Sequence, residues 1–529
     1  MVMSSIVDSG TKADSNSTES SAAETSSNPS DIQKSSGKSS NDASNTNDAS
    51  NKMERSLTKR HVQFIAIGGT IGTGLFLGSG KSISLTGPSI VFVYIIVGLI
   101  MFLLMRGIGE LMYKDPNQHT FISFITRYLG RGWGNFAGWS YWFVLVLIGM
   151  SEITAVSTYC VTFFQTFDID VSHWKWLIEV VFLAALVCIN LVAVKLFGET
   201  EFWFSMIKIT LIVVLIATAI VMALIGYHYS ATPLHGGVIS PAGHAGLDNI
   251  FNNFSLMPNG WLAFLMSFQM VFYAYQLIEF VGVTVSETKN PRQVLPKAIN
   301  EIIVRVLVFY VGALIAIMLI VPWQQFKATN AEGVFMSPFI MVFQYAGVQW
   351  ASALVFFVVI TAASSALNSL LYSAGRHMYQ IALESPSPLL GKLRKVSRTK
   401  VPANAILFSA ALILLSPIIN SIPGVHGAFI LFASASSAVI IMIYILIMVT
   451  HRKYRESADF LPDGFVMPHY KLLNSITIAF FVFVYVTLFI SDDTRASAIG
   501  GLVWLALFGG YCALHQHWQN RDLAKALGK

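Results

Sequence analysis

Long apolar segments follow one another from residue 62 to residue 516, and they limit what this chain can fold into more than any other feature. A helix needs roughly 20 apolar residues to cross a bilayer core that is about 30 Å thick. By that criterion we count about twelve candidate spans, which predict an all-α integral membrane protein. Their ranges are 62–82, 88–112, 134–164, 176–196, 202–226, 261–285, 301–322, 350–379, 403–421, 427–450, 472–491 and 497–516.

The composition supports a membrane protein and excludes an ordinary cytosolic enzyme. Hydrophobic residues make up 54% of the 529 residues and charged residues only 12%, whereas a soluble domain carries about 25% charged residues. The chain therefore has too little charge to cover the surface of a soluble protein of this length. The three cysteines, Cys160, Cys188 and Cys512, lie in apolar runs, which argues against a disulfide scaffold and against a cysteine-ligated zinc site.

Three regions are expected along the chain. Residues 1–54 are rich in Ser, Asn and Asp and contain no aromatic residue, so we expect a disordered cytoplasmic tail. This tail lacks the apolar core of a secretory signal. Residues 55–518 are expected to form the transmembrane domain, and residues 519–529 a second cytoplasmic tail.

The basic residues indicate the orientation, because loops on the cytoplasmic side of a membrane carry an excess of Lys and Arg. With a cytoplasmic N-terminus, only Lys81, Lys175, Lys327 and Arg495 fall on the outer side. We therefore expect a multi-pass protein of the cell (plasma) membrane with both termini in the cytoplasm. The same distribution accounts for the net charge of +6, so no nucleic-acid partner is expected.

The first predicted span contains four glycines within residues 68–74. Each glycine destabilises a helix by about 1 kcal/mol relative to alanine. One interpretation is a break in the helix, whose freed backbone groups line a cavity and whose positive helix end faces a carboxylate. The other interpretation is close helix packing through small residues. The segment alone is compatible with both.

Lys208 is the basic residue that no loop explains, because it lies inside the span 202–226. A charged lysine deep in the bilayer costs at least about 2.5–3.5 kcal/mol. Its side chain either extends to the membrane surface or faces a cavity, where it gains and loses a proton during the working cycle. The second interpretation predicts a proton-coupling site.

Carboxylates are also expected inside the membrane, at Glu152 in the third span and at Glu279 near the middle of the sixth. Such groups are costly and usually mark ion or substrate pathways. For Glu279 the alternative is a structural hydrogen bond to backbone that a helix break has freed. Glu110, at the inner end of the second span, is expected to pair with Arg106.

Signals for catalysis and for cofactors are weak. His228, His235 and His244 share a loop, but their spacing matches no compact zinc motif. Residues Gly78–Ser82 resemble the end of a phosphate-binding loop, but Leu75 stands where that pattern requires a glycine. We therefore expect no enzyme activity, no cofactor and no bound metal.

Taken together, the motifs resemble the amino acid transporter family of the amino acid–polyamine–organocation superfamily, from Arg60 to about Gln516. Besides the glycine-rich span, the matching segments are Phe197–Phe204 leading to Lys208, Ser286–Pro291, Leu295–Asn300, Ser337–Phe339, Ser364–Ser369 and Val401–Ala405. Two further segments, Leu77–Ser89 and Asp492–Arg495, resemble the bacterial D-serine/D-alanine/glycine transporters within that family. The serine-rich tail lies outside the resemblance.

The resemblance implies a LeuT-like fold of two inverted five-helix repeats, with helices 1 and 6 broken, followed by two further helices. It also implies proton-coupled import of amino acids by alternating access, with an amino acid, protons and the lipid bilayer as partners. By position, the substrate carboxylate meets the amides of Thr73 and Gly74, and the amine meets the carbonyls of Thr70, Tyr273 and Gln276.

The resemblance also assigns roles to the buried charges. Lys208 matches a lysine that occupies the place of a sodium ion in relatives, and Glu279 matches the glutamate of the broken sixth span. The expected proton-coupling residues are Lys208 and Glu152. The expected substrate-binding residues are Thr70, Ile71, Gly72, Thr73, Gly74, Tyr273, Ala274, Gln276, Leu277 and Glu279.

At Leu277 the chain departs from the family, which usually has glycine two residues before this glutamate. A leucine there either fills part of the pocket, which favours small substrates, or moves the helix break and changes the carbonyls offered by Tyr273 and Gln276.

The leading functional hypothesis is a proton symporter for small neutral amino acids such as alanine, serine or glycine, with D-forms among the options. The alternatives are a permease for aromatic or branched-chain amino acids and a transporter-like amino acid sensor that signals through the N-terminal tail. A channel fits less well, because helices broken at mid-membrane suit an occluded site better than a continuous pore.

Overall fold

The computed structural model describes residues 71–116, 118, 120–165, 167–192, 194–233, 239–252, 254–280, 290–327, 337–346, 349–385, 387–422 and 427–526. The predicted N-terminal tail and the first nine residues of the predicted first span lie outside these ranges, as does the matching segment Ser286–Pro291 up to residue 289. The predicted C-terminal tail begins within the last helix.

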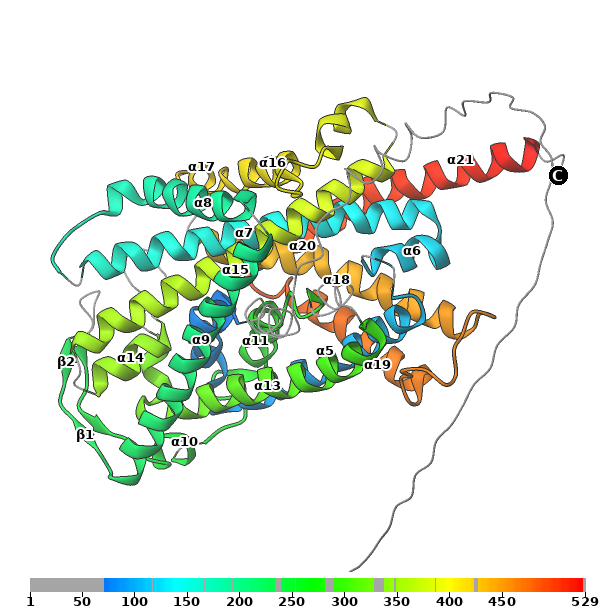
Figure 1. Ribbon diagram of the computed structural model, residues 1–529. Helices are drawn as coiled ribbons and strands as arrows, with labels where there is room; N and C mark the ends of the chain where they lie inside the picture. The colour runs from blue at the N-terminus through cyan, green and yellow to red at the C-terminus, as the bar shows by residue number, and fades with distance from the viewer. Residues whose placement is uncertain are drawn as a thin grey trace, which may run out of the picture. The chain divides into compact units, whose positions relative to one another are not determined.

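Helices dominate the described residues (Figure 1). The first half of the chain contains α3 (Thr73–Phe76), α4 (Gly78–Thr86), η1 (Gly87–Ser89), α5 (Ile90–Lys114), α6 (Ile122–Leu129), α7 (Arg131–Gln165), η2 (Ser172–Trp174), α8 (Lys175–Val192), α9 (Val194–Leu224), α10 (Asp248–Phe251) and α11 (Gly260–Ala274). The second half contains α13 (Pro291–Ile320), η3 (Trp323–Lys327), α14 (Pro338–Tyr345), α15 (Gln349–Glu384), η4 (Pro388–Arg394), α16 (Ala403–Ile413), α17 (Ser416–Asn420), α18 (Ala428–Arg455), α19 (Tyr470–Thr487), α20 (Asp492–Trp504), η5 (Leu505–Gly509) and α21 (Gly510–Ala526).

Strands are confined, in the described residues, to the connection between α9 and α10. Two antiparallel pairs form there, β1 (His228–Tyr229) with β4 (Gly243–His244) and β2 (Thr232–Pro233) with β3 (Ile239–Ser240). In the first pair His228 faces His244, and in the second Thr232 faces Ser240.

Ten helical segments in the described ranges are long and apolar enough to cross a membrane. They are Gly78–Lys114, Arg131–Gln165, Ser172–Val192, Phe197–Leu224, Pro291–Ile320, Ala353–Glu384, Ala403–Asn420, Ala428–Arg455, Tyr470–Thr487 and Asp492–Trp518. The remaining two predicted spans are the first, which begins outside the described residues, and the sixth, which contains the shorter apolar helix α11. The predicted all-α membrane fold is confirmed.

Both of these spans are interrupted. In the first, α3 starts at Thr73 after Gly72, whose backbone is extended, although the apolar segment begins at residue 62. In the sixth, α11 ends at Ala274 and a turn follows over residues 275–279, inside the apolar segment. The backbone of Leu277 within this turn is left-handed, with φ of +69°. The described part of the glycine-rich segment is therefore non-helical at Ile71 and Gly72.

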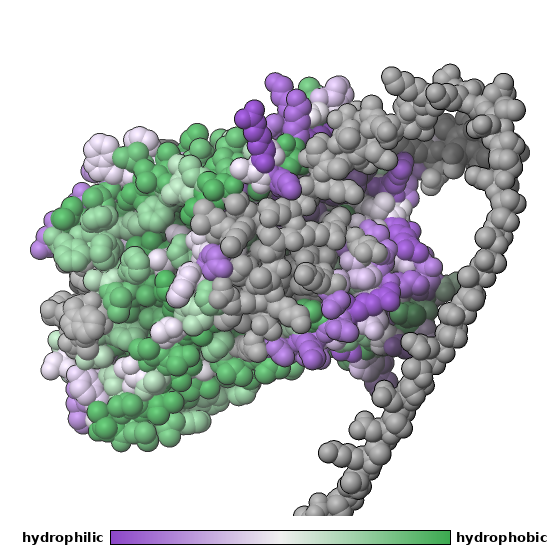
Figure 2. All heavy atoms as spheres, viewed as in Figure 1, coloured by the Kyte–Doolittle hydropathy of each residue, from purple (hydrophilic) through white to green (hydrophobic). Residues whose placement is uncertain are grey.

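The helix α7 lies at the centre of the bundle and is buried along almost its whole apolar stretch. It packs against α15 and α18, and Figure 1 shows α15 crossing beside it. A helix that is apolar on all sides is stable only when other helices surround it or lipid does. Peripheral helices such as α8 and α19 instead turn apolar side chains outward. Figure 2 shows hydrophobic surface on the side of the bundle where α8 lies.

Hydrophilic residues gather mainly at the end of the bundle where α6 lies (Figure 2). An ion pair joins Arg127 of α6 to Asp459, which follows α18, with a nitrogen–oxygen distance of 2.7 Å. Hydrogen bonding to Tyr128 and the adjacent Arg127 guanidinium lower the pKa of the Asp459 carboxyl. This end carries many of the basic residues that the orientation argument places in the cytoplasm.

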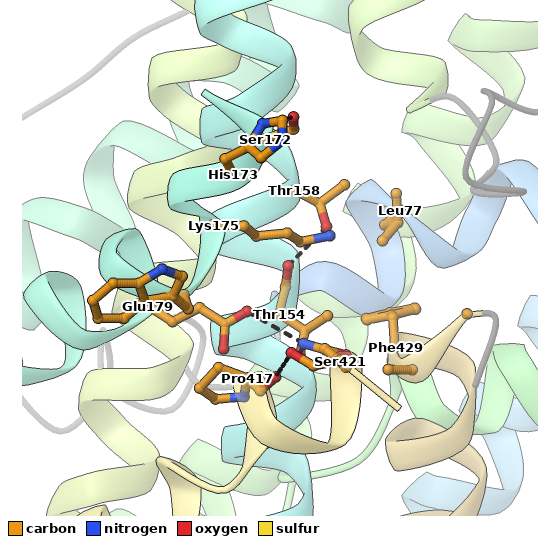
Figure 3. A pocket seen from close by; sticks show the side chains of 14 residues that line it. Leu77, Thr154, Thr158, Ser172, His173, Lys175, Glu179, Pro417, Ser421 and Phe429 are labelled. Atoms are coloured by element: carbon orange, nitrogen blue, oxygen red, sulfur yellow. Dashed lines mark hydrogen bonds between the residues drawn. The ribbon is translucent and has the colours of Figure 1, made fainter. Parts of the chain in front are cut away.

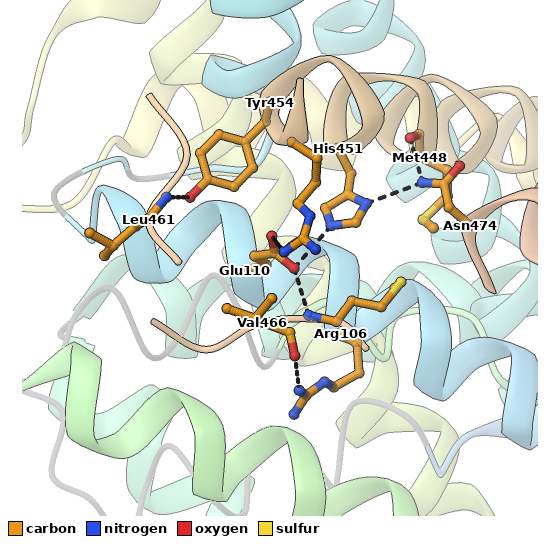
Figure 4. A network of polar contacts seen from close by, with 10 residues as sticks. Arg106, Glu110, Met448, His451, Tyr454, Leu461, Val466 and Asn474 are labelled. Carbon is orange, nitrogen blue, oxygen red and sulfur yellow. Dashed lines mark hydrogen bonds and ion pairs between the residues drawn. The ribbon is translucent and has the colours of Figure 1, made fainter. Parts of the chain in front are cut away.

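A buried polar network fixes the same end (Figure 4). Glu110 of α5 accepts hydrogen bonds from His451 Nε2 at 3.1 Å, Arg455 Nη1 at 3.0 Å and the Met467 amide at 2.7 Å. Arg106, the expected partner, attracts Glu110 electrostatically, but the hydrogen bonds of the glutamate come from these other residues. Arg106 donates instead to the Val466 carbonyl, because the segment after α18 folds back beneath α5.

Candidate substrate and coupling site

The two interrupted spans meet directly at Gly74 and Ala274. A Cβ atom placed on Gly74 would lie 2.6 Å from Ala274 Cα, closer than any side chain tolerates. The glycine therefore allows α3 to approach the end of α11 at backbone contact. This contact brings together the two segments in which the sequence predicts the substrate-binding residues.

Glu152 of α7 lies against the start of α3. Its Oε1 accepts a hydrogen bond from Thr73 Oγ1 at 2.8 Å, and a Cβ on Gly72 would lie 3.1 Å from the same oxygen. The glutamate is 3% exposed. A membrane carboxylate is thus held at the first turn of α3, where helix amides have no carbonyl partner within their own helix.

Lys208 of α9 lies on the other side of the same break and is fully buried. Its Nζ donates to the Ile71 carbonyl at 3.2 Å and to Ser365 Oγ of α15 at 2.8 Å. The side chain therefore points into the bundle and does not extend to the membrane surface. Glu152 and Lys208 also attract each other electrostatically across the break.

The sequence argument did not single out Glu201, which is fully buried on α9. Ser365 Oγ donates to Glu201 Oε1 at 2.6 Å, and Asn368 Nδ2 donates to Oε2 at 3.4 Å. Asn190 of α8 in turn donates to Asn368 at 2.8 Å. One signal was available in the sequence, because Glu201 and Lys208 are seven residues apart and share a helix face.

Glu279 belongs to a separate polar cluster. Its two carboxylate oxygens accept hydrogen bonds from Tyr141 of α7 at 3.1 Å and from Tyr444 of α18 at 2.7 Å. All three side chains are buried. The glutamate therefore links the turn after α11 to two helices through the tyrosine hydroxyl groups. This is a structural role, and it is compatible with a further role in the substrate pathway.

The side chains of Tyr273 and Gln276 are both engaged in hydrogen bonds. Tyr273 donates to Ser151 Oγ at 3.0 Å, next to Glu152 in the chain. Gln276 donates to Ser437 Oγ at 2.7 Å and accepts from Ser436 at 3.3 Å, both on α18. These contacts anchor the turn on α7 and α18.

Of the predicted site residues, the structure places two hydrogen-bonded pairs at the first break, Thr73 with Glu152 and Ile71 with Lys208. Ala274 lies against Gly74, whereas Glu279 lies in its own cluster. Thr70 lies outside the described residues.

A helical bundle with two interrupted spans that meet at buried charged side chains has the architecture of a membrane transporter. The chain belongs to the amino acid permease family, whose sequence model matches residues 61–522. The family consists of transporters and not of enzymes, and its substrates are amino acids.

Three relatives are similar over almost their whole length. The serine permease of Lactococcus lactis subsp. cremoris is 44% identical over 461 residues, 87% of this chain and 97% of the relative. The DL-alanine permease of the same organism is 44% identical over 456 residues, 86% of this chain and 94% of the relative. The D-serine/D-alanine/glycine transporter of Escherichia coli (strain K12) is 38% identical over 461 residues, which cover 86% of this chain and 93% of the relative.

The family resemblance drawn from the motifs is therefore confirmed. Within the family, the serine and DL-alanine permeases share more identical residues with this chain than the D-serine/D-alanine/glycine transporter does.

Proposed function

We propose that this permease imports small neutral amino acids, such as alanine, serine or glycine, together with protons. Support for the substrate comes from the names of three relatives, which describe a serine permease, a DL-alanine permease and a D-serine/D-alanine/glycine transporter. The basic residues at one end of the bundle support a position in the cell membrane with both termini in the cytoplasm.

The proposed substrate site is the meeting point of the two interrupted spans. There the amino acid carboxylate binds at the amides of Thr73 and Gly74, and its amine binds at backbone carbonyls near Tyr273 and Gln276. Backbone groups at a helix break are suited to this role, because they carry partial charges that need no side chain. Leu277 keeps the site small.

The observation that carries proton coupling is the contact of Lys208 Nζ with the Ile71 carbonyl at the break. A charged ammonium binds a carbonyl more strongly than a neutral amine does. Loss of the proton from Lys208 therefore weakens the contact between α9 and the first span. If Lys208 gains its proton from one side of the membrane and loses it to the other, the strength of this contact changes as the protein alternates between its outward-open and inward-open states.

Glu152 adds a second coupling element. With Lys208, Glu201 and Glu152 all ionised, the group at the break has one net negative charge, next to the proposed place of the substrate carboxylate. Two carboxylates at one site repel each other unless one is protonated. Binding of the substrate therefore favours a proton on Glu152.

The test is uptake by purified protein in proteoliposomes, with and without an imposed proton gradient, and with unlabelled L- and D-amino acids as competitors. We expect alanine, serine and glycine to compete, and an inward proton gradient to drive accumulation. Equal accumulation of the substrate with and without the imposed proton gradient would contradict proton coupling. Competition by leucine or phenylalanine alone would contradict the proposed substrate class.

A further inference from the structure

A cavity, which we call the α8 cavity, lies between α7, α8, α17 and the start of α18 (Figure 3). Its volume is about 410 Å³, and the residues that matter here are Leu77, Thr158, Lys175, Glu179, Asn420 and Phe429. A water molecule takes up about 30 Å³ in the liquid, so the cavity accommodates a small solute with several waters. It lies towards the Gln165 end of α7, far along that helix from Arg131 and the basic end.

Glu179 is a buried carboxylate in the wall of this cavity, and it is 1% exposed. Its Oε1 accepts hydrogen bonds from Ser157 Oγ at 2.8 Å and from Asn420 Nδ2 at 3.3 Å. Its Oε2 has no hydrogen-bond partner in the described part of the chain, and the Ser416 hydroxyl also lies near the carboxyl group. A carboxylate accepts up to about four hydrogen bonds, so Glu179 has capacity for a cationic ligand.

Lys175 lines the same cavity and is only partly buried. It lies four residues before Glu179 on α8, so the two side chains share one face of the helix. The cavity wall therefore carries one carboxylate and one ammonium a helical turn apart. This charge pattern is complementary to a free amino acid, which carries an ammonium and a carboxylate on one carbon atom.

A thin layer of side chains separates the α8 cavity from the proposed substrate site. Phe429 lines the cavity, and the ring of Tyr273 packs edge-on against it with 5.9 Å between ring centroids. Tyr273 donates to Ser151 Oγ, which in turn approaches the Phe429 carbonyl at 3.5 Å. Glu152, which follows Ser151 in the chain, lies on the far side of this layer and binds Thr73 of α3.

We propose that the α8 cavity is a staging site for the amino acid on the outer side of the membrane. The substrate ammonium binds Glu179 and its carboxylate binds Lys175. Displacement of the layer formed by Tyr273, Ser151 and Phe429 then passes the substrate to α3. The proposal rests on the proposed function for the substrate class and for the orientation.

The test compares transport kinetics at the two faces of the membrane. Glu179→Gln keeps an oxygen for Ser157 and Asn420 but removes the charge, and Lys175→Gln removes the cation at the rim. In right-side-out vesicles we expect each variant to raise the KM for alanine roughly tenfold, as for one lost charge-assisted hydrogen bond. In inside-out vesicles, the KM of each variant should equal that of the wild type.

The matched control is Glu456→Gln, which removes an exposed carboxylate at the opposite end of the bundle and should change neither KM. Equal KM shifts at both faces, or none at the outer face, would overturn the staging site. If Glu179→Gln does not accumulate in the membrane, Lys175→Gln decides the question alone. Failure of the proposed function is seen separately, as wild-type protein that transports none of the small amino acids.

Discussion

Lys208 and Glu201 lie two turns apart on α9 and are joined by one hydroxyl group, that of Ser365 on α15. The ammonium donates to this hydroxyl at 2.8 Å, and the hydroxyl donates to the carboxylate at 2.6 Å. Both charged side chains are fully buried. A buried charge is stable in a membrane only with a partner, so Glu201 keeps the ammonium at the break.

Replacement of Lys208 should separate coupling from binding. Lys208→Ala removes the donor to the Ile71 carbonyl, so we expect accumulation against a gradient to fall to equilibration. Substrate affinity should change by less than about tenfold, because the proposed binding amides lie on α3. Lys208→Arg should also fail to couple, since a guanidinium keeps its proton. Uptake with and without a pH gradient, beside equilibrium binding in the same purified variants, measures both effects.

Two further variants serve as controls for Lys208. Glu201→Gln keeps a hydrogen-bond acceptor for Ser365 but removes one of the two carboxylates that attract the ammonium, so we expect weaker coupling with intact membrane insertion. If Lys208→Ala still concentrates the substrate in response to a proton gradient, the coupling site lies elsewhere, and Glu152→Gln becomes the next variant to measure.

Glu279 should tolerate glutamine better than alanine. Tyr141 and Tyr444 both donate to its carboxylate, and alanine leaves two buried hydroxyl groups without an acceptor. Each such group costs about 1–3 kcal/mol. Glutamine keeps one oxygen, and its amide donates to the other tyrosine. We expect a lower melting temperature and much lower uptake for Glu279→Ala than for Glu279→Gln.

The paired removal of a donor tests the same interaction from the other side. Tyr444→Phe in the Glu279→Ala background should cost less than Tyr444→Phe alone, because the hydroxyl has already lost its acceptor. Near-normal uptake and stability in both glutamate variants would show that the cluster has no role in the transport cycle.

Gly74 should be intolerant of alanine, with Gly78 as the matched control. A Cβ at Gly74 collides with the backbone of Ala274, whereas a Cβ at Gly78 meets the Met270 side chain, with its sulfur at 2.8 Å. Methionine moves aside easily and backbone does not. We expect Gly74→Ala to destabilise the protein by about 1–3 kcal/mol and to lose substrate binding. Gly78→Ala should melt close to the wild type; equal melting temperatures for the two variants would refute the argument.

The sequence was sufficient to predict the features that depend on local composition. Apolar segments of membrane-spanning length predict the helices, because the bilayer imposes one length scale on every span. The clustered glycines were compatible with a helix break and with close helix packing, and the cost of membrane charge singled out Lys208, Glu152 and Glu279 as buried groups. Their roles in binding and coupling stay predictions.

The partners of these charges could not be predicted in the same way. Ser365 lies 164 positions after Glu201 in the chain, and no local pattern indicates that α15 packs against α9 there. Glu110 was expected to pair with Arg106, but α18 and the segment after it supply its hydrogen-bond partners. Hydrogen bonds of this kind depend on tertiary packing, which helical periodicity alone does not encode.

The backbone of Leu277 is left-handed, a conformation that suits the glycine that the family resemblance implies at this position. Its φ of +69° is a conformation that glycine adopts freely and that costs other residues about 1–2 kcal/mol. The turn nevertheless keeps this conformation, since Gln276 is anchored on α18 and Glu279 on α7 and α18. The leucine side chain is buried beside these anchors.

Two substitutions at Leu277 separate the effect of side-chain size from that of the backbone. Leu277→Gly and Leu277→Ala both shorten the side chain, so we expect both to admit larger amino acids. The gain should be graded, because one methylene contact discriminates by only about 1–3 kcal/mol. Only glycine relieves the left-handed strain, so Leu277→Gly should be about 1 kcal/mol more stable than Leu277→Ala. Competition of alanine uptake by valine, leucine and phenylalanine measures the first effect, and thermal unfolding of the purified variants measures the second. A competition profile identical to the wild type in both variants would mean that Leu277 points away from the substrate, whereas equal stability of the two would mean that the turn relaxes once the leucine is gone.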